Sequence, residues 1–209
     1  MPSCIQWRRI VKIDKNYCAI DLELNTDPDG STPVPRIIQV GIAIGSYNDY
    51  TNGTLITKKW YLDPKESIYP FITSLTGITD NDISTLSVTH LELATELTEI
   101  VTKHDCFVNP ITWGGGDSVE LKREFREHNI NLKLFGRRWI DCKTLYVCDL
   151  IAEGKNPAGG LTSAITRHKL KFEGTPHRAD YDALNTLRLF FKMIEKRKNI
   201  EDGLKLIMK

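Results

Sequence analysis

The stretch YCAIDLEL, residues Tyr17–Leu24, holds two carboxylates inside an otherwise apolar segment. Apolar and β-branched residues in a run of this length predict a buried strand. Because side chains two residues apart on a strand share a face, Asp21 and Glu23 are expected to project together. Two adjacent carboxylates repel each other and resist burial. A divalent cation bound by both would remove that conflict. The alternative is a pair of solvated acids at the end of a strand.

The segments on either side of this strand predict a mixed sheet flanked by helices. The run IIQVGIAIG, Ile37–Gly45, is apolar except for Gln39 and predicts a second central strand. Residues 54–62 predict a third, and the short connections favour an antiparallel meander. Further strands are expected at 106–113 and 139–140. Apolar spacing predicts helices at 89–103, 118–128, 143–152, 161–168 and 179–198. This order is typical of the α/β class, and a single domain over residues 1–209 is expected.

Composition argues against several classes of protein, although a near-neutral net charge still allows a local basic groove or a cluster of carboxylates around metal. The chain has 28 basic and 27 acidic side chains, whereas a protein that coats duplex DNA is usually far more basic. An odd number of cysteines without a Cys-x-x-Cys pattern argues against a disulfide framework or a zinc ribbon, and favours reduced thiols and a cytoplasmic location. No apolar run is long enough to cross a membrane. The charged segment Met1–Asp14 does not resemble a signal peptide.

A second acidic motif, HRADYDA at His177–Ala183, precedes an apolar helical pattern. If both His177 and Asp182 were helical, they would lie about 140° apart around the axis. They can converge only if His177 lies in the loop before the helix, which Pro176 favours. Without a partner, a histidine in this position is usually a surface or capping residue.

A third acidic position follows the glycine-rich turn Gly114–Gly116. Asp117 stands there at the start of a predicted helix, where an aspartate can act as a cap. Asp105 is a rival candidate, but it lies at a predicted strand start with no turn to place it.

Together these motifs resemble those of the DEDDh, or DnaQ-like, exonuclease family over about residues 15–196. The elements that match are Asp-x-Glu in an early strand, a mid-chain Asp after a turn, and a late His-x-Ala-x-x-Asp. The sequence SLTGIT, Ser74–Thr79, also resembles the Leu-Thr-Gly-Ile element of Eri-type RNA exonucleases and their bacterial and phage relatives. One departure is Gly116, which stands where an aromatic residue often precedes the Asp. The resemblance implies a ribonuclease H-like fold.

The resemblance also implies a metal site. Asp21, Glu23 and Asp182 would hold a first divalent cation, and Asp117 would reach a second, which Asp21 also contacts. Hard oxygen ligands favour Mg²⁺ or Mn²⁺. His177 would act as the general base of a two-metal hydrolysis, since an unperturbed imidazole titrates near pH ~6.5.

Further assignments concern the substrate. The resemblance implies that the backbone around Leu22 and Leu24 meets the 3′-terminal nucleotide, and that Leu75 and Thr76 pack against it. Family spacing selects Asp182 as the ligand in the third motif, so Asp180 is expected to be a helix cap.

The predicted function is therefore 3′-to-5′ hydrolysis of single-stranded nucleic acid to nucleoside 5′-monophosphates. The Leu-Thr-Gly-Ile element favours RNA slightly over DNA. One alternative is a nucleic-acid-binding adaptor on an inactive nuclease fold, although such proteins usually lose a carboxylate. Another is a proofreading module bound to a polymerase, for which no docking segment is evident. The sequence identifies no protein partner.

Overall fold

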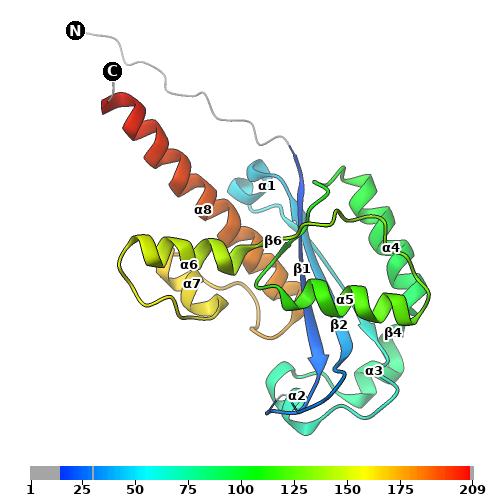
Figure 1. Ribbon diagram of the computed structural model, residues 1–209. Coiled ribbons are helices and arrows are strands. Elements are labelled where there is room, and N and C mark those ends of the chain that lie inside the picture. Colours follow the sequence, from blue (N-terminus) through cyan, green and yellow to red (C-terminus); the bar gives the residue numbers. More distant parts are fainter. Residues whose placement is uncertain (1–14, 30, 208–209) are drawn as a thin grey trace.

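The computed structural model describes residues 15–29 and 31–207 and is built around a mixed sheet (Figure 1). The six strands follow the order β4-β3-β2-β1-β5-β6. The β1–β2 and β2–β3 pairs are antiparallel, and the remaining pairs are parallel. The strands are β1 (Tyr17–Asn25), β2 (Arg36–Gly45), β3 (Ile56–Leu62), β4 (Ser87–Val88), β5 (Ile111–Thr112) and β6 (Ile140–Asp141). The predicted α/β class is confirmed.

Helices cover both faces of this sheet. Figure 1 shows α4 and α5 on one side, with α6, α7 and α8 on the other, while α2 and α3 lie near the end of β1. The helices are α1 (Tyr47–Asn52), α2 (Pro70–Thr76), α3 (Asp80–Leu86), α4 (His90–Lys103), α5 (Gly116–Glu127), α6 (Cys142–Ala152), α7 (Leu161–Arg167) and α8 (Ala179–Ile207). The sheet is thus the middle of three layers.

The alternation of side chains along β1 divides the core in two. Cys18, Ile20 and Leu22 pack against α4 and α5. Ala19, two residues before Asp21, packs on the opposite face with residues of α6, α7 and α8. Because alternate residues share a face, Asp21 and Glu23 belong to the α8 side. The predicted pair of carboxylates therefore lies beneath the start of the last helix.

Several elements differ from those predicted. The strand expected at 106–113 is only Ile111–Thr112, since Asp105 has a left-handed backbone and the chain after it loops before joining the sheet. The short helices α1, α2 and α3 were not predicted, although α1 and α3 begin with capping boxes. The last helix runs to Ile207 rather than to about 198, because no proline interrupts it.

Two expectations from composition can be compared with the structure. No helix within residues 15–29 and 31–207 has the length and apolar character needed to cross a membrane. Cys18, Cys106, Cys142 and Cys148 are free thiols. Cys4 and the segment Met1–Asp14 lie outside the described residues.

Candidate active site

Three acidic side chains meet where α8 begins. Carboxylate oxygens of Asp21, Glu23 and Asp182 all lie within 4.8 Å of one another. Strand β1 supplies the first two from one face, and the first turn of α8 supplies the third. The structure therefore brings together the first and third acidic motifs.

Asp117 lies beside this group but outside the 4.8 Å cluster. Burial raises the pKa of its carboxyl to about 7, against an opposing hydrogen bond from the backbone of Leu22 on β1. The expected role of Asp117 as a helix cap is wrong. The N-cap of α5 is Gly115, and Asp117 lies inside the first turn. In this position the carboxylate of Asp117 faces β1.

The rival residue, Asp105, is far more exposed and forms an ion pair with Lys15 at 2.6 Å. A charge that is already paired and solvated offers little to the site. The structure thus favours Asp117 as the mid-chain carboxylate.

Burial first, and the crowding of like charges second, raise the pKa values of the site. The pKa of Asp21 is raised well above its usual value, first by burial and then by the charges of Asp117, Asp182 and Glu23. Burial and the same aspartates raise the pKa of Glu23 to about 8, although Arg178 opposes the shift. Burial also raises the pKa of Asp182 to about 6.

No ion pair within the described part of the chain involves any of these four carboxylates. Buried negative charge without a compensating cation is unfavourable. Carboxylate oxygens are also the ligands that Mg²⁺ and Mn²⁺ prefer. The donor set therefore fits divalent cations.

His177 lies in the loop before α8, as the sequence predicts. Its backbone has a left-handed conformation, with φ of 61°, and the residue is exposed. Its backbone N–H donates to Oδ2 of Asp182 at 2.9 Å. This bond ties the histidine to one carboxylate of the cluster and leaves the imidazole free to reach solvent.

The predicted substrate residues divide into two groups. Leu75, at the end of α2, is 40% exposed and presents an apolar side chain to solvent. Thr76 is buried, and its hydroxyl donates to the Ile72 carbonyl and accepts from the Ile78 N–H. The hydroxyl of Thr76 is therefore already used within the turn.

The other two substrate residues, Leu22 and Leu24, pack their side chains into the core on the α4 and α5 side of the sheet. Only their backbone remains for the α8 side. This agrees with the expectation that the backbone, rather than the side chains, meets a nucleotide.

Two further residues shape the site in ways that the sequence did not predict. Asp180 is not the expected helix cap; it lies inside α8 and pairs with Lys59 of β3 at 3.2 Å. Asp141 accepts a hydrogen bond from Gly114 N–H at 3.1 Å and so fixes the turn before Asp117. Both are long-range contacts, which local sequence patterns do not report.

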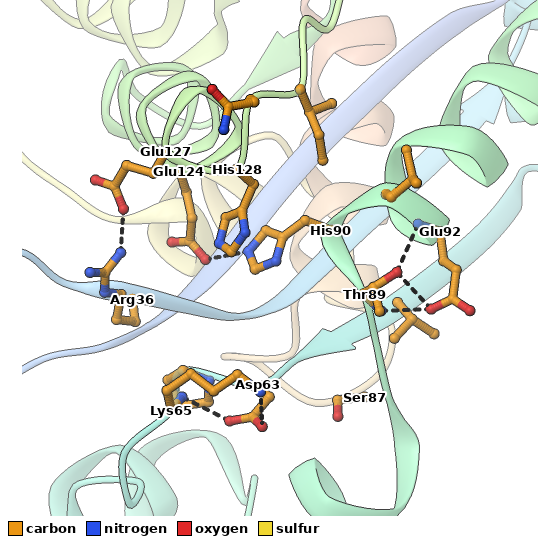
Figure 2. Close-up of a pocket in the computed structure, with 15 residues that line it drawn as sticks. Arg36, Asp63, Lys65, Ser87, Thr89, His90, Glu92, Glu124, Glu127 and His128 are labelled. Carbon is orange, nitrogen blue, oxygen red and sulfur yellow. Dashed lines mark hydrogen bonds and ion pairs between the residues drawn. The ribbon is translucent and has the colours of Figure 1, made fainter.

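A cleft of about 860 Å³ lies at the other end of α5, away from Asp117 (Figure 2). Within it, Nε2 of His90 lies 2.8 Å from Oε1 of Glu124, and the rings of His90 and His128 stack with centroids 3.6 Å apart. Oε2 of Glu124 accepts from the Ile37 N–H at 3.0 Å. At the rim, Glu127 pairs with Arg36. These charged groups satisfy one another.

The fold and the carboxylate site together define a ribonuclease H-like nuclease. The family model described as Exonuclease (RNase_T) matches residues 18–190, and the chain belongs to this exonuclease family. The predicted exonuclease family is confirmed by this match. The predicted ribonuclease H-like fold is confirmed by its likeness to the nuclease domain of a DEDDh family member. A search of curated proteins found no significant match.

Solved structures share the fold at low sequence identity. The nuclease domain of 3′hExo, a DEDDh family member bound to rAMP, is 19% identical with a TM-score of 0.75, over 87% of this chain and 92% of that one. A 3′-exonuclease that recognises the histone mRNA stem-loop is 18% identical with a TM-score of 0.74, over 87% and 82%. Cell-death related nuclease 4 (CRN-4) is 16% identical with a TM-score of 0.74, over 87% and 64%.

Proposed function

We propose that this exonuclease removes nucleoside 5′-monophosphates from the 3′ end of single-stranded nucleic acid and prefers RNA to DNA. The observation that carries the proposal is a group of four carboxylates without an ion-pair partner among the described residues, beside an exposed histidine. Glu23 is buried, and Asp21, Asp117 and Asp182 are half-buried.

The carboxylates are the proposed ligands of two cations, Mg²⁺ or Mn²⁺. Asp21, Glu23 and Asp182 would hold one ion, while Asp117 and Asp21 would hold the other. When bound, such ions activate the attacking water and stabilise the departing 3′ oxygen. The raised pKa values mean that cation binding must displace protons near neutral pH.

His177 is the proposed general base. Its backbone bond to Asp182 places the residue at the edge of the carboxylate cluster, and its exposure lets the imidazole pass a proton to solvent. General-base catalysis of this kind contributes roughly 10²–10⁴-fold to a rate. The chain thus supplies both the charge for binding cations and an acceptor for the proton of the nucleophile.

The end of α2 is the proposed site of the terminal nucleotide. Leu75 offers an apolar surface for the base or sugar, and the backbone of Leu22 and Leu24 forms the adjacent edge. For Thr76 we propose contact through the backbone, since its hydroxyl is bonded within the turn.

The preference for RNA has two supports. One is the Leu-Thr-Gly-Ile element at residues 75–78. The other is the fold shared with structures that contain rAMP or recognise a histone mRNA stem-loop. Discrimination would depend on contacts with the 2′-hydroxyl.

A direct test uses 5′-labelled RNA and DNA of the same sequence, single-stranded and duplex, with Mg²⁺ or Mn²⁺. We expect shortening from the 3′ end, release of nucleoside 5′-monophosphates, faster loss of single-stranded RNA, and no reaction with EDTA or with Asp21→Ala. Equal rates on RNA and DNA would overturn the substrate preference. Tight binding without any hydrolysis would instead support the adaptor on an inactive fold.

A further inference from the structure

Gln39, the polar residue that interrupts the apolar run of β2, lies beside the carboxylate site. The register pairs Glu23 of β1 with Gln39, and Gln39 with Tyr61 of β3. Directly opposite residues share a face of the sheet, so these side chains form one row beneath α8. The next row, one step back along β1, consists of Asp21, Gly41 and Lys59. Each row thus begins with a carboxylate of the site.

Gln39 accepts a hydrogen bond from the first turn of α8. It is fully buried, and its Oε1 accepts from the backbone N–H of Ala179 at 2.9 Å. The first N–H groups of a helix have no partner within the helix. A side chain of the sheet therefore satisfies a helix donor three residues before Asp182.

Gly41 allows the helix to approach the sheet closely. A Cβ at this position would lie 2.0 Å from the backbone carbon of Ala179 and 2.1 Å from the nitrogen of Asp180. Any side chain here would push α8 away from β2. The small residue and the amide of Gln39 thus fix both the distance and the register of the helix start.

Side chains of strand β3 also contact the start of α8. Lys59 pairs with Asp180 at 3.2 Å, and the guanidinium of Arg178 donates to the Tyr61 hydroxyl at 2.5 Å. Arg178 also donates to the carbonyl of Thr76, at the end of α2, at 3.4 Å. Polar contacts therefore surround the residues between His177 and Asp182.

We infer that Gln39 is a positioning residue, supported by Lys59 and Tyr61, which sets Asp182 against Asp21 and Glu23. This inference rests on the proposed function, because its role is to complete the cation site. Nε2 of Gln39 has no partner among the described residues, and an unpaired buried amide costs stability. Gln39 therefore contributes the position of α8 rather than added stability.

The test is direct binding of Mn²⁺, measured by electron paramagnetic resonance on the metal-free protein. Gln39→Met keeps the length of the side chain and removes the acceptor for Ala179. We expect the dissociation constant for Mn²⁺ to rise about 10–100-fold, as for other residues that support metal ligands. Activity should recover towards the wild-type level at saturating Mn²⁺. The folded fraction of the metal-free variant is measured alongside by circular dichroism, because cation binding would also recover a partly unfolded protein.

Thr186→Val is the matched control. Thr186 is also fully buried, lies on α8, and has a hydroxyl without a partner among the described residues. Its replacement should leave Mn²⁺ affinity unchanged. If Thr186→Val weakens Mn²⁺ binding as much as Gln39→Met does, the effect belongs to the helix as a whole and the inference is wrong.

The outcomes separate the inference from the proposed function. If the wild-type protein binds no Mn²⁺, the proposed cation site fails. If the wild type binds and Gln39→Met binds equally well, the positioning role fails alone. If Gln39→Met does not fold, Tyr61→Phe replaces it as the test. This variant removes only the hydroxyl that accepts from Arg178 beside the first turn of α8. A Mn²⁺ affinity equal to that of the wild type would then contradict the inference.

Discussion

The two ends of α5 carry two clusters of acidic groups that differ in how their charge is balanced. At the start of the helix, Asp117 joins carboxylates that have no ion pair within the described chain. At its end, both oxygens of Glu124 accept from the protein, one from Ile37 N–H and one near His90. Glu127 pairs with Arg36 and Arg123. The cleft encloses about 860 Å³, yet its acidic groups are already paired within the protein.

This difference separates a site that needs a ligand from one that holds the fold together. Crowded, largely desolvated carboxylates destabilise the metal-free protein when they are ionised, and either protons or an external cation can remove that cost. A buried carboxylate with two donors stabilises the contact between elements. A cavity is therefore not by itself evidence of a ligand site.

The largest expected effect is on catalysis. Asp182→Asn removes one charge from the carboxylate cluster while keeping its shape. We expect turnover to fall at least about a thousandfold, equivalent to ~4 kcal/mol of barrier. Glu124→Ala, in the cleft, should leave turnover per folded molecule within about threefold. Single-turnover rates on a labelled oligonucleotide measure both, and equal losses would erase the distinction between the two clusters.

His177→Ala separates catalysis from cation binding within the active cluster. The rate should fall about 10²–10³-fold, because the general base is lost. The Mn²⁺ dissociation constant should change little, since the imidazole is not among the proposed ligands. Calorimetric titration with Mn²⁺ checks this, and lost affinity would show that the histidine is itself a ligand.

Stability should respond in opposite directions at the two clusters. Glu124→Ala leaves Ile37 N–H and His90 without an acceptor and should lower the free energy of unfolding by about 2–4 kcal/mol. Asp21→Asn relieves repulsion and should raise it by about 1 kcal/mol without metal. Urea denaturation in EDTA measures both. A destabilised Asp21→Asn would mean that its charge is compensated in the folded protein.

The last prediction is a pH dependence of stability that metal reduces. The folded-state pKa values of Asp182, Asp117 and Glu23 are raised to about 6, 7 and 8. Their unfolded values lie near ~4, so the folded state binds more protons between these limits. Stability from these groups is complete below pH ~4 and is lost as the pH rises through 6 to 8.

The melting temperature of the metal-free protein should therefore fall between pH 5 and 8. Saturating Mn²⁺ should reduce this fall, because the cation takes the place of the protons. Asp182→Asn should flatten part of the metal-free decline. A metal-free melting temperature that rises over this range would contradict the assigned shifts.

Local patterns predicted most of the site but not its support. Strand periodicity placed Asp21 and Glu23 on one face, and the loop-to-helix geometry placed His177 before α8. Asp117 was singled out as a cation ligand, which stays a prediction, whereas the helix cap that its position also suggested is not formed. These outcomes depend on residues close together in the sequence.

The contacts that fix the start of α8 against β2 and β3 could not be predicted, because they form between segments far apart in the sequence. Gln39 and Ala179 lie 140 residues apart, and Lys59 and Asp180 lie 121 apart. The sequence showed Gln39 only as a polar break in an apolar strand. Its function becomes visible when the register of the sheet and the position of the helix are known together.

The most direct test of the account is a crystal of the protein soaked in Mn²⁺ and measured by anomalous diffraction. The account predicts two peaks, about 3.5–4 Å apart as in other two-metal sites, with Asp21 touching both and Asp117 on the side away from Glu23 and Asp182. Peaks only beside His90, Glu124 and His128, or none at the carboxylates, would contradict it.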